Sequence, residues 1–370
     1  MKLSAPVRYA VVGLGHISQA AVLPAFGHAA RNSHLSAVVS GDPLKRKKLG
    51  KKYGVPGCSY DEYESLLSSG EIDAVYIALP NSLHAEYAVR AARQRIHVLC
   101  EKPMAVTEDE CQQMIHAAQE NKVCLMVAYR LHFEEANLKA VEIARSGKLG
   151  DLRAFESFFS MQVKAGDIRL QRELGGGTLY DIGIYCINAA RYLFQAEPEE
   201  VTATTANKGD GRFREVDEMT SAVLRFPGER LAVFTCSFGA FDQSRYEIIG
   251  TKGSLRVEPA YGYVNELAHE LKIGEKVTRK TFAPRDQFAS ELLYFSDCVL
   301  QNDYPEPSGT EGLADVRVVR ALYRSAETGQ PVRLGDFARS KRPSLAQEIR
   351  RPPVRKEPEL VHAESPKAPK

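Results

Sequence analysis

The sequence contains no tryptophan, and none of its cysteines stands in a CxxC pair. Without tryptophan, a ligand that needs a large aromatic platform must find it in another side chain. An odd number of scattered cysteines does not suit a disulfide scaffold and is typical of thiols kept reduced in a cytosol. The seven cysteines are Cys58, Cys100, Cys111, Cys124, Cys186, Cys236 and Cys298.

Long apolar runs are also missing. No uncharged apolar stretch reaches the length of about 18 residues that a transmembrane helix needs. The first residues, MKLSAPVRYAVVGLG, lack the apolar core and cleavage site of a secretory signal. A net charge of +2 with 26% charged residues is nearly balanced, which argues against binding nucleic acid over the whole surface. We expect a cytoplasmic protein whose partners include neither membrane nor nucleic acid.

Metal-ligand spacing is absent as well. The nine histidines form no HExxH or similar pattern, so the sequence predicts no metal site.

The chain has 370 residues, which is longer than one compact core usually holds. Two domains are expected, over residues 1–130 and 131–336. Residues 337–370 are rich in proline and charge and cannot bury enough apolar surface to fold alone. We interpret them as a disordered tail or as an arm that wraps a neighbouring subunit.

The first domain alternates short β-branched runs with helical stretches, the pattern of parallel βαβ units. The predicted strands lie in residues 8–15, 34–40, 74–80, 96–103 and 124–130. The second domain changes to strands in residues 152–161, 201–206, 218–226, 230–238, 245–250 and 254–260, with tight turns between several of them. The fold class predicted is α/β: a doubly wound Rossmann sheet followed by an α+β domain with an open, mostly antiparallel sheet.

Residues 13–18, GLGHIS, follow the first strand and open a helix, as a dinucleotide fingerprint requires. Gly13 would make the tight turn, and Gly15 would let backbone N–H groups approach a pyrophosphate. Ser18 replaces the third glycine with another small residue. The residues expected at the cofactor here are Gly13, Leu14, Gly15, His16 and Ile17.

The second strand should end in a carboxylate if the cofactor is NAD, but it ends in Ser40 and Gly41. The Ser40 hydroxyl can donate to a 2′-phosphate, and Lys45 one turn later can neutralise its charge. NADP is therefore the cofactor predicted. Asp42 could reach the ribose instead, although Asp42 before Pro43 also fits a helix N-cap.

Catalytic candidates stand in two motifs. Lys102 follows the apolar run IHVLC, at the strand end where open α/β sheets bind ligands. Residues 175–185, GGGTLYDIGIY, carry Asp181 and Tyr185 four positions apart on one helix. If the two domains face each other across a cleft, the lysine would favour the tyrosine phenolate and make it a usable base. The alternative is a solvated lysine and a buried tyrosine bonded to a capping aspartate.

Together with ALPNSLHAEYAVRAA, VAYRLHFE and IRLQREL, these motifs resemble the Gfo/Idh/MocA oxidoreductase family over residues 7–335. The similarity is greatest to its branch of glucose–fructose oxidoreductase and aldose dehydrogenases. The resemblance implies Tyr185 as acid/base, Lys102 at the reacting hydroxyl, Asp181 as an orienting group and a cis Lys102–Pro103 bond. It also implies Arg169 at the substrate, beside Ile168 where the family has tryptophan. Further cofactor positions implied are Leu79, Pro80, Asn81, His84, Glu101 and Arg130.

The function expected is NADP-dependent oxidation of a cyclic aldose at C1 to the lactone, with bound NADPH recycled if a second sugar is reduced to a polyol. The resemblance also implies a homo-oligomer, dimer or tetramer, formed through the C-terminal sheet. The alternatives left open are a sugar-responsive regulator on the same fold and a glycosidase that uses the nicotinamide transiently.

Overall fold

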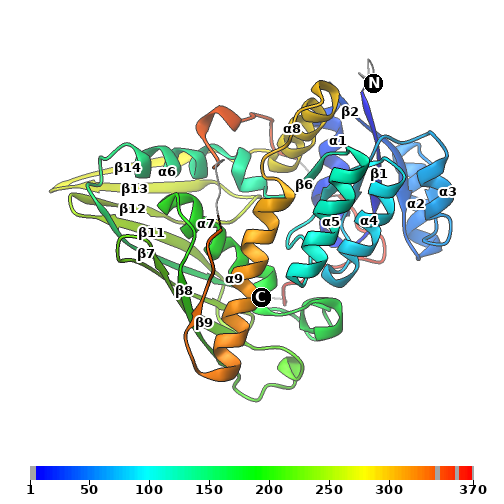
Figure 1. The fold of residues 1–370 in the computed structure, drawn as a ribbon. Helices are drawn as coiled ribbons and strands as arrows, with labels where there is room; N and C mark the ends of the chain where they lie inside the picture. Colours follow the sequence, from blue (N-terminus) through cyan, green and yellow to red (C-terminus); the bar gives the residue numbers. More distant parts are fainter. Residues whose placement is uncertain (1–5, 338–341, 355–357, 369–370) are drawn as a thin grey trace. The chain divides into compact units, whose positions relative to one another are not determined.

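The computed structural model describes residues 6–337, 342–354 and 358–368, and the chain forms two compact units (Figure 1). The first unit contains Met1–Arg130, Arg285–Leu313 and Ile349–Ser365; the second contains Leu131–Pro284, Ala314–Glu348 and Pro366–Lys370. Each unit is therefore discontinuous in sequence, whereas the sequence predicted one continuous stretch per domain. The first unit is discontinuous because a helix far along the sequence, Gln287–Gln301, packs with the N-terminal residues.

A parallel sheet forms the centre of the first unit. Within the described residues it has six strands, ordered β3 (Gly57–Cys58), β2 (Ser33–Val39), β1 (Val7–Val12), β4 (Ala74–Ile77), β5 (His97–Cys100) and β6 (Leu125–Val127). Every neighbouring pair runs parallel. All four residues of β4 are buried, as expected for a strand covered on both faces, which reads as a continuous apolar run.

Helices cover this sheet on both faces. The helices of the unit are α1 (Leu23–Ala29), α2 (Pro43–Tyr53), α3 (Tyr63–Ser68), α4 (His84–Arg93), α5 (Glu108–Asn121) and α8 (Gln287–Gln301). Helices α4 and α5 lie side by side, and α8 packs beside α1 and against β1 (Figure 1). The Tyr9 hydroxyl on β1 lies 2.6 Å from Ser296 Oγ on α8, which ties this distant helix to the sheet.

The second unit contains a large mixed sheet. Its nine strands among the described residues are ordered β14 (Lys276–Phe282), β13 (Leu267–Ile273), β12 (Gly253–Val257), β11 (Gln243–Gly250), β7 (Leu152–Ser160), β10 (Arg230–Ser237), β9 (Met219–Phe226), β8 (Glu200–Ala206) and β15 (Val332–Arg333). Only β7 and β10 pair in parallel among these neighbours. The α/β fold class predicted from the sequence is confirmed.

One face of this sheet is covered by α6 (Glu135–Arg145) and α7 (Ile184–Phe194), as Figure 1 shows. Burial alternates strictly along β9, which is the pattern of a strand with one packed and one open face. The last long helix, α9 (Gly309–Thr328), begins in the first unit and continues in the second.

The C-terminal segment, expected to be a disordered tail or an arm on a neighbouring subunit, has described residues that bond to their own chain. The backbone N–H of Lys164 donates to the carbonyl of Pro366 at 3.0 Å, and that of Ala368 donates to the carbonyl of Gln162 at 2.8 Å. The N–H of Val361 donates to the Gln19 side chain at 2.7 Å. The parts of the predicted tail at 338–341, 355–357 and 369–370 lie outside the described residues.

Candidate active site

The glycine loop has the geometry of a phosphate cradle. Gly13 has φ +93°, and a Cβ atom there would stand 2.4 Å from the carbonyl oxygen of Ala78, so only glycine fits the turn. A Cβ atom on Gly15 would meet nothing within 4 Å, which leaves the open approach that a pyrophosphate needs. The buried Ser18 hydroxyl donates to the Gly13 carbonyl at 2.6 Å and closes the loop. The loop therefore fits a dinucleotide.

The end of β2 presents a hydroxyl and basic side chains. Ser40 is buried, and its Oγ accepts from the N–H of Asp42 at 3.2 Å, which leaves the hydroxyl hydrogen available to donate. Arg46 Nη1 donates to the Ser40 carbonyl at 2.7 Å, so a guanidinium stands over this strand end. Asp42 Oδ1 accepts from the N–H groups of Leu44 and Lys45, which confirms the N-cap role.

Lys102 follows β5 in a loop that a buried histidine holds. The Lys102–Pro103 bond is cis, as the resemblance implied. His84 is fully buried, with Nδ1 2.8 Å from the Pro103 carbonyl and Nε2 2.9 Å from the Leu79 carbonyl. Burial lowers the pKa of His84, which favours the neutral ring. His84 thus links two loops at the same sheet edge and positions the lysine backbone, instead of presenting its ring to solvent.

Beside this loop lies a cluster of buried charge. Glu101 accepts from the Tyr76 hydroxyl at 2.8 Å and from the N–H of Lys102 at 3.3 Å. Burial raises the pKa of Glu101, against the opposing charges of Lys102 and Arg130. Arg130, also buried, donates to Gln287 on α8. The sequence predicted Glu101 and Arg130 here but gave no signal for the α8 residue.

In the second unit, Arg169 and Asp181 form an ion pair. Arg169 Nε donates to Asp181 Oδ2 at 2.7 Å, and Nη1 donates to Asp167 Oδ1 at 3.2 Å. Burial acts to lower the pKa of Arg169, but the carboxylates of Asp181 and Asp167 outweigh it and hold the pKa above its ordinary value. The two residues predicted at the substrate are therefore fixed relative to each other. Ile168 beside them is 46% exposed.

Two of the glycines before the helix, Gly176 and Gly177, are packed tightly. A Cβ atom on Gly176 would stand 2.4 Å from the Arg169 carbonyl, and one on Gly177 would stand 2.3 Å from the Tyr323 hydroxyl. The N–H of Gly177 donates to the Arg169 carbonyl at 3.0 Å. The absence of side chains lets the loop that carries Arg169 pack on the start of the next helix.

Asp181 and Tyr185 occupy the junction between a π-helical turn, Leu179–Gly183, and α7. The Tyr185 ring meets Phe159 edge to face at 5.6 Å and Tyr261 at 5.8 Å between ring centroids. Such π turns are frequent at functional sites. Lys102 belongs to the first unit and Tyr185, Asp181 and Arg169 to the second, so the meeting of lysine and tyrosine predicted from the sequence stays a prediction.

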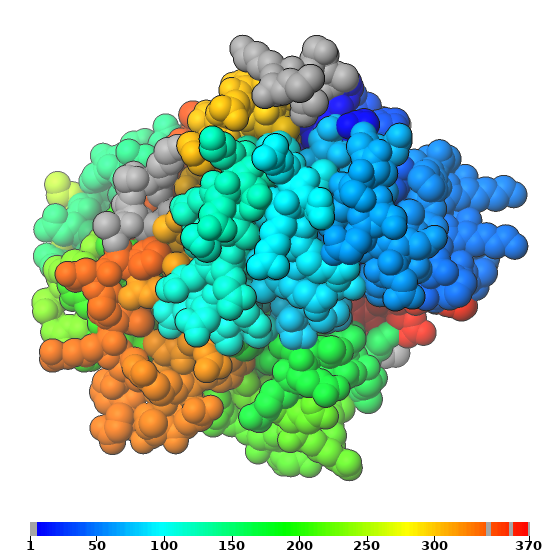
Figure 2. Space-filling view, turned by 45° about the vertical axis from the view of Figure 1, so that its right-hand side comes forward, coloured from blue at the N-terminus to red at the C-terminus, as the bar shows by residue number. Residues whose placement is uncertain are grey.

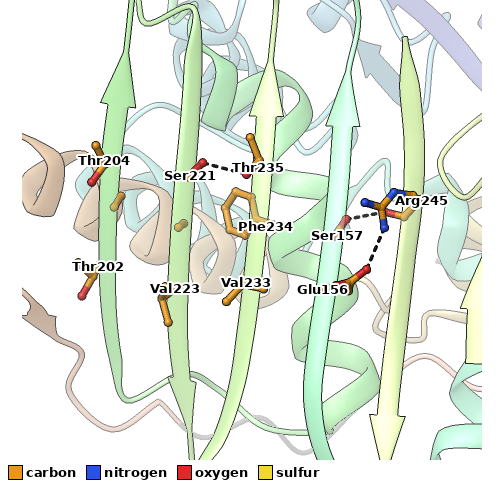
Figure 3. A pocket seen from close by; sticks show the side chains of 12 residues that line it. Glu156, Ser157, Thr202, Thr204, Ser221, Val223, Val233, Phe234, Thr235 and Arg245 are labelled. Atoms are coloured by element: carbon orange, nitrogen blue, oxygen red, sulfur yellow. Dashed lines mark hydrogen bonds and ion pairs between the residues drawn. The ribbon is translucent and has the colours of Figure 1, made fainter. Parts of the chain in front are cut away.

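A hollow of about 360 Å³ on the open face of the large sheet contains none of these residues (Figure 3). Arg245 Nη1 pairs with Glu156 at 2.8 Å, and the Ser221 and Thr235 hydroxyls lie 2.8 Å apart. Val223 and Val233 are exposed on the same face. Apart from the Arg245–Glu156 pair, the lining consists of serine, threonine and apolar side chains.

No three His, Cys, Asp or Glu side chains in residues 6–337, 342–354 and 358–368 gather in a way that could hold a metal ion. No helix in these ranges is long and apolar enough to cross a membrane.

The parallel sheet in this strand order, the glycine turn after its first strand and the basic end of its second define a dinucleotide-binding oxidoreductase fold joined to a second α/β unit. Family comparison agrees with this class. Residues 7–129 match the oxidoreductase family with an NAD-binding Rossmann fold, and residues 137–256 match the GFO/IDH/MocA C-terminal domain. The chain belongs to the Gfo/Idh/MocA family.

Three relatives illustrate the similarity. D-xylose 1-dehydrogenase [NADP(+)] of Haloarcula marismortui is 33% identical, covering 89% of this chain and 93% of its own. The aldose–aldose oxidoreductase structure from Caulobacter crescentus, complexed with glycerol, is 36% identical at a TM-score of 0.85, covering 89% of this chain and 100% of its own. The 3-ketoreductase KijD10 from Actinomadura kijaniata, in complex with NADP and TDP-benzene, is 27% identical at a TM-score of 0.80, covering 86% of this chain and 98% of its own.

Proposed function

We propose that the protein is an NADP-dependent oxidoreductase that oxidises a cyclic aldose of the glucose or xylose type at C1 to the lactone. One observation carries the proposal: Lys102 and the Tyr185 motif both occur in a chain that resembles aldose enzymes over 89% of its length. A regulator that only bound a sugar and a nucleotide would have no need of both groups.

The chain's own residues would divide the work as follows. Tyr185 Oη would take the proton of the C1 hydroxyl, and Lys102 would contact the same hydroxyl. Asp181, held by Arg169 at 2.7 Å, accepts a hydrogen bond from a sugar hydroxyl and orients the ring. Bound NADP⁺ supplies the hydride acceptor. The proposal requires the lysine of one unit and the tyrosine of the other to act on the same hydroxyl.

The choice of NADP is supported by the end of β2. Ser40 offers a hydroxyl donor, and Lys45 and Arg46 stand on the first turn of α2. The Asp42 oxygen that faces this helix is already used in the cap. These groups favour a 2′-phosphate over a free ribose hydroxyl.

A second half-reaction is part of the proposal because a relative is named an aldose–aldose oxidoreductase. In this half-reaction Tyr185 would return the proton to the carbonyl oxygen of a second, open-chain sugar, with the hydride supplied to its carbonyl carbon by reduced cofactor that has stayed bound. One sugar is then oxidised to a lactone and another is reduced to a polyol, with no net change in the cofactor.

The direct test identifies the nucleotide released when purified protein is denatured and then adds glucose or xylose to native protein while nicotinamide absorbance is followed. A single reduction of bound NADP, with turnover only after a second sugar is added, supports the recycling form. Steady reduction of added NADP by one aldose supports a simple dehydrogenase. No reduction with any aldose would overturn the proposal, and release of free sugar from a glycoside would favour the glycosidase instead.

Replacing Tyr185 with phenylalanine tests the acid/base assignment. We expect turnover to fall by roughly 100-fold or more, the usual size of a general acid/base contribution, with nucleotide binding retained. Tyr304→Phe is the matched control, because it removes one hydroxyl from a side chain that is 79% exposed. Equal turnover of the two variants would contradict the role given to Tyr185.

A further inference from the structure

The C-terminal segment 358–365 passes the glycine loop of the first unit. There it contacts the π-helical turn that follows the loop, Ser18–Val22. Gln19, 2% exposed, accepts from the Val361 N–H at 2.7 Å and donates to the Val361 carbonyl at 3.0 Å. The same side-chain amide donates to the Leu14 carbonyl at 2.9 Å. Gln19 thus fixes one residue of the segment to the loop expected to hold the pyrophosphate. Figure 2 shows the red C-terminal atoms against the blue N-terminal ones.

One residue further on, the segment reaches the end of β2. His362 Nδ1 donates to Asp42 Oδ2 at 2.9 Å, and the backbone of His362 has φ +45°. This bond lowers the pKa of Asp42 below its ordinary value, against a smaller opposing effect of burial. Since Asp42 Oδ1 already caps α2, both carboxylate oxygens are engaged.

This pairing bears on which nucleotide the site accepts. A free carboxylate two residues after Ser40 would accept a hydrogen bond from a ribose 2′-OH, as in NAD sites. The same carboxylate would repel a 2′-phosphate, which carries close to two negative charges. A histidine N–H bonded to it offsets part of the repulsion and occupies the oxygen that a ribose would use.

We propose that His362 is the residue that sets the cofactor preference, because it masks Asp42 and so lets the end of β2 accept a 2′-phosphate next to Ser40, Lys45 and Arg46. The inference rests on the proposed use of NADP and adds a residue from the far end of the chain to that site. His362 acts through Asp42 and is a positioning residue.

The test measures binding of two fragments of the cofactor that lack the nicotinamide, so it is independent of turnover. Adenosine 2′,5′-bisphosphate carries the 2′-phosphate and adenosine 5′-monophosphate does not. Both are titrated calorimetrically into the full-length protein after bound nucleotide has been removed. For His362→Ala we expect affinity for the bisphosphate to fall about 10-fold, the size expected for one uncancelled charge near a phosphate. Affinity for the monophosphate should be unchanged or higher.

Three variants separate masking from mere anchoring. His362→Lys supplies another donor to Asp42 and should retain the preference. The double variant Asp42→Asn with His362→Ala removes the carboxylate that needs masking and should regain affinity for the bisphosphate. His116→Ala is the matched control, because His116 forms an exposed pair with Glu120 at 3.1 Å on α5, and it should alter neither affinity.

The outcomes also distinguish this inference from the function on which it rests. A wild-type preference for the bisphosphate that persists in His362→Ala, or an equal loss of both ligands, overturns the role of His362 and leaves the NADP assignment standing. A wild-type protein with no preference between the fragments overturns both.

Discussion

Glu291 on α8 is a buried acid without a partner. Its side chain is fully buried, and neither carboxylate oxygen has a hydrogen-bond partner in the described part of the chain. Burial raises its pKa well above the ordinary value; the nearby Glu101 adds to the rise, and Arg130 opposes it. A neutral acid is therefore the form compatible with the folded protein at neutral pH.

This gives a prediction for pH dependence. Above the ordinary pKa of a glutamate the unfolded chain releases the proton while the folded chain keeps it, so Glu291 lowers the free energy of unfolding as pH rises toward its folded pKa. Glu291→Gln should abolish this contribution. The free energy of unfolding of the variant, taken relative to the wild type, should therefore be higher at pH 8 than at pH 5 by ~1 kcal/mol or more. Denaturant unfolding at the two pH values measures it.

Glu275→Gln, at an exposed turn position, is the matched control and should change neither value. An unaltered pH profile in Glu291→Gln would mean that Glu291 is ionised in the folded state.

Residues adjacent to a recognisable loop could be predicted, and those that arrive from afar could not. The glycine loop, Ser40, Lys102 and Asp181 each follow a strand or precede a helix, so local patterns mark them as candidates, whereas Arg169 was implied only by the family resemblance. His362 lies 320 positions from Asp42, in a segment whose composition resembles a disordered tail. No spacing rule connects residues so far apart in sequence, because their contact depends on the fold of the whole chain.

At the scale of elements, α7 is anchored by a buried ion pair. Arg191 is fully buried, donates to Asp315 on α9 and pairs with Glu197 at 2.6 Å through its Nε. Removing one partner leaves a buried carboxylate without its counter-charge.

Arg191→Met should therefore lower the free energy of unfolding by about 3–5 kcal/mol. Arg225 on β9 forms an exposed pair with Glu229. Arg225→Met breaks this pair and should lower the free energy of unfolding by less than about 1 kcal/mol. Chemical denaturation of both variants gives the comparison. Similar losses in the two would show that solvent reaches Arg191 and screens its pairs.

Elements with a clear apolar period were predicted and those without were not. The strands over residues 218–226 and 230–238 alternate apolar and polar residues, and they form β9 and β10. The hairpin of β13 and β14 went unpredicted, because six of the seven residues of β14, KVTRKTF, are exposed and give no buried face to detect. Pairing along β13 decides its conformation.

At the scale of the whole molecule, the open sheet face should set the oligomeric state. Val223, Leu231 and Val233 are each more than 40% exposed on neighbouring strands, an apolar surface that isolated proteins seldom leave uncovered. We predict that the protein self-associates through this face (Figure 3). Val233→Asp should weaken association about 10-fold or more by placing unpaired charge in the contact, as light scattering across concentrations would show.

Val264→Asp, at a 56% exposed loop position, is the control that should leave the mass unchanged. If Val233→Asp also left the mass unchanged, the subunits would have to meet elsewhere.

The discontinuity of the units has a consequence for how the protein is made. A ribosome delivers the chain from the N-terminus, yet α8 packs on the parallel sheet from a position far along the sequence. The strands of the first unit therefore stay incompletely covered until residues 287–301 have been synthesised. During that interval their exposed apolar surface can associate with other chains, so the first unit depends on the later helix to be protected from misassembly.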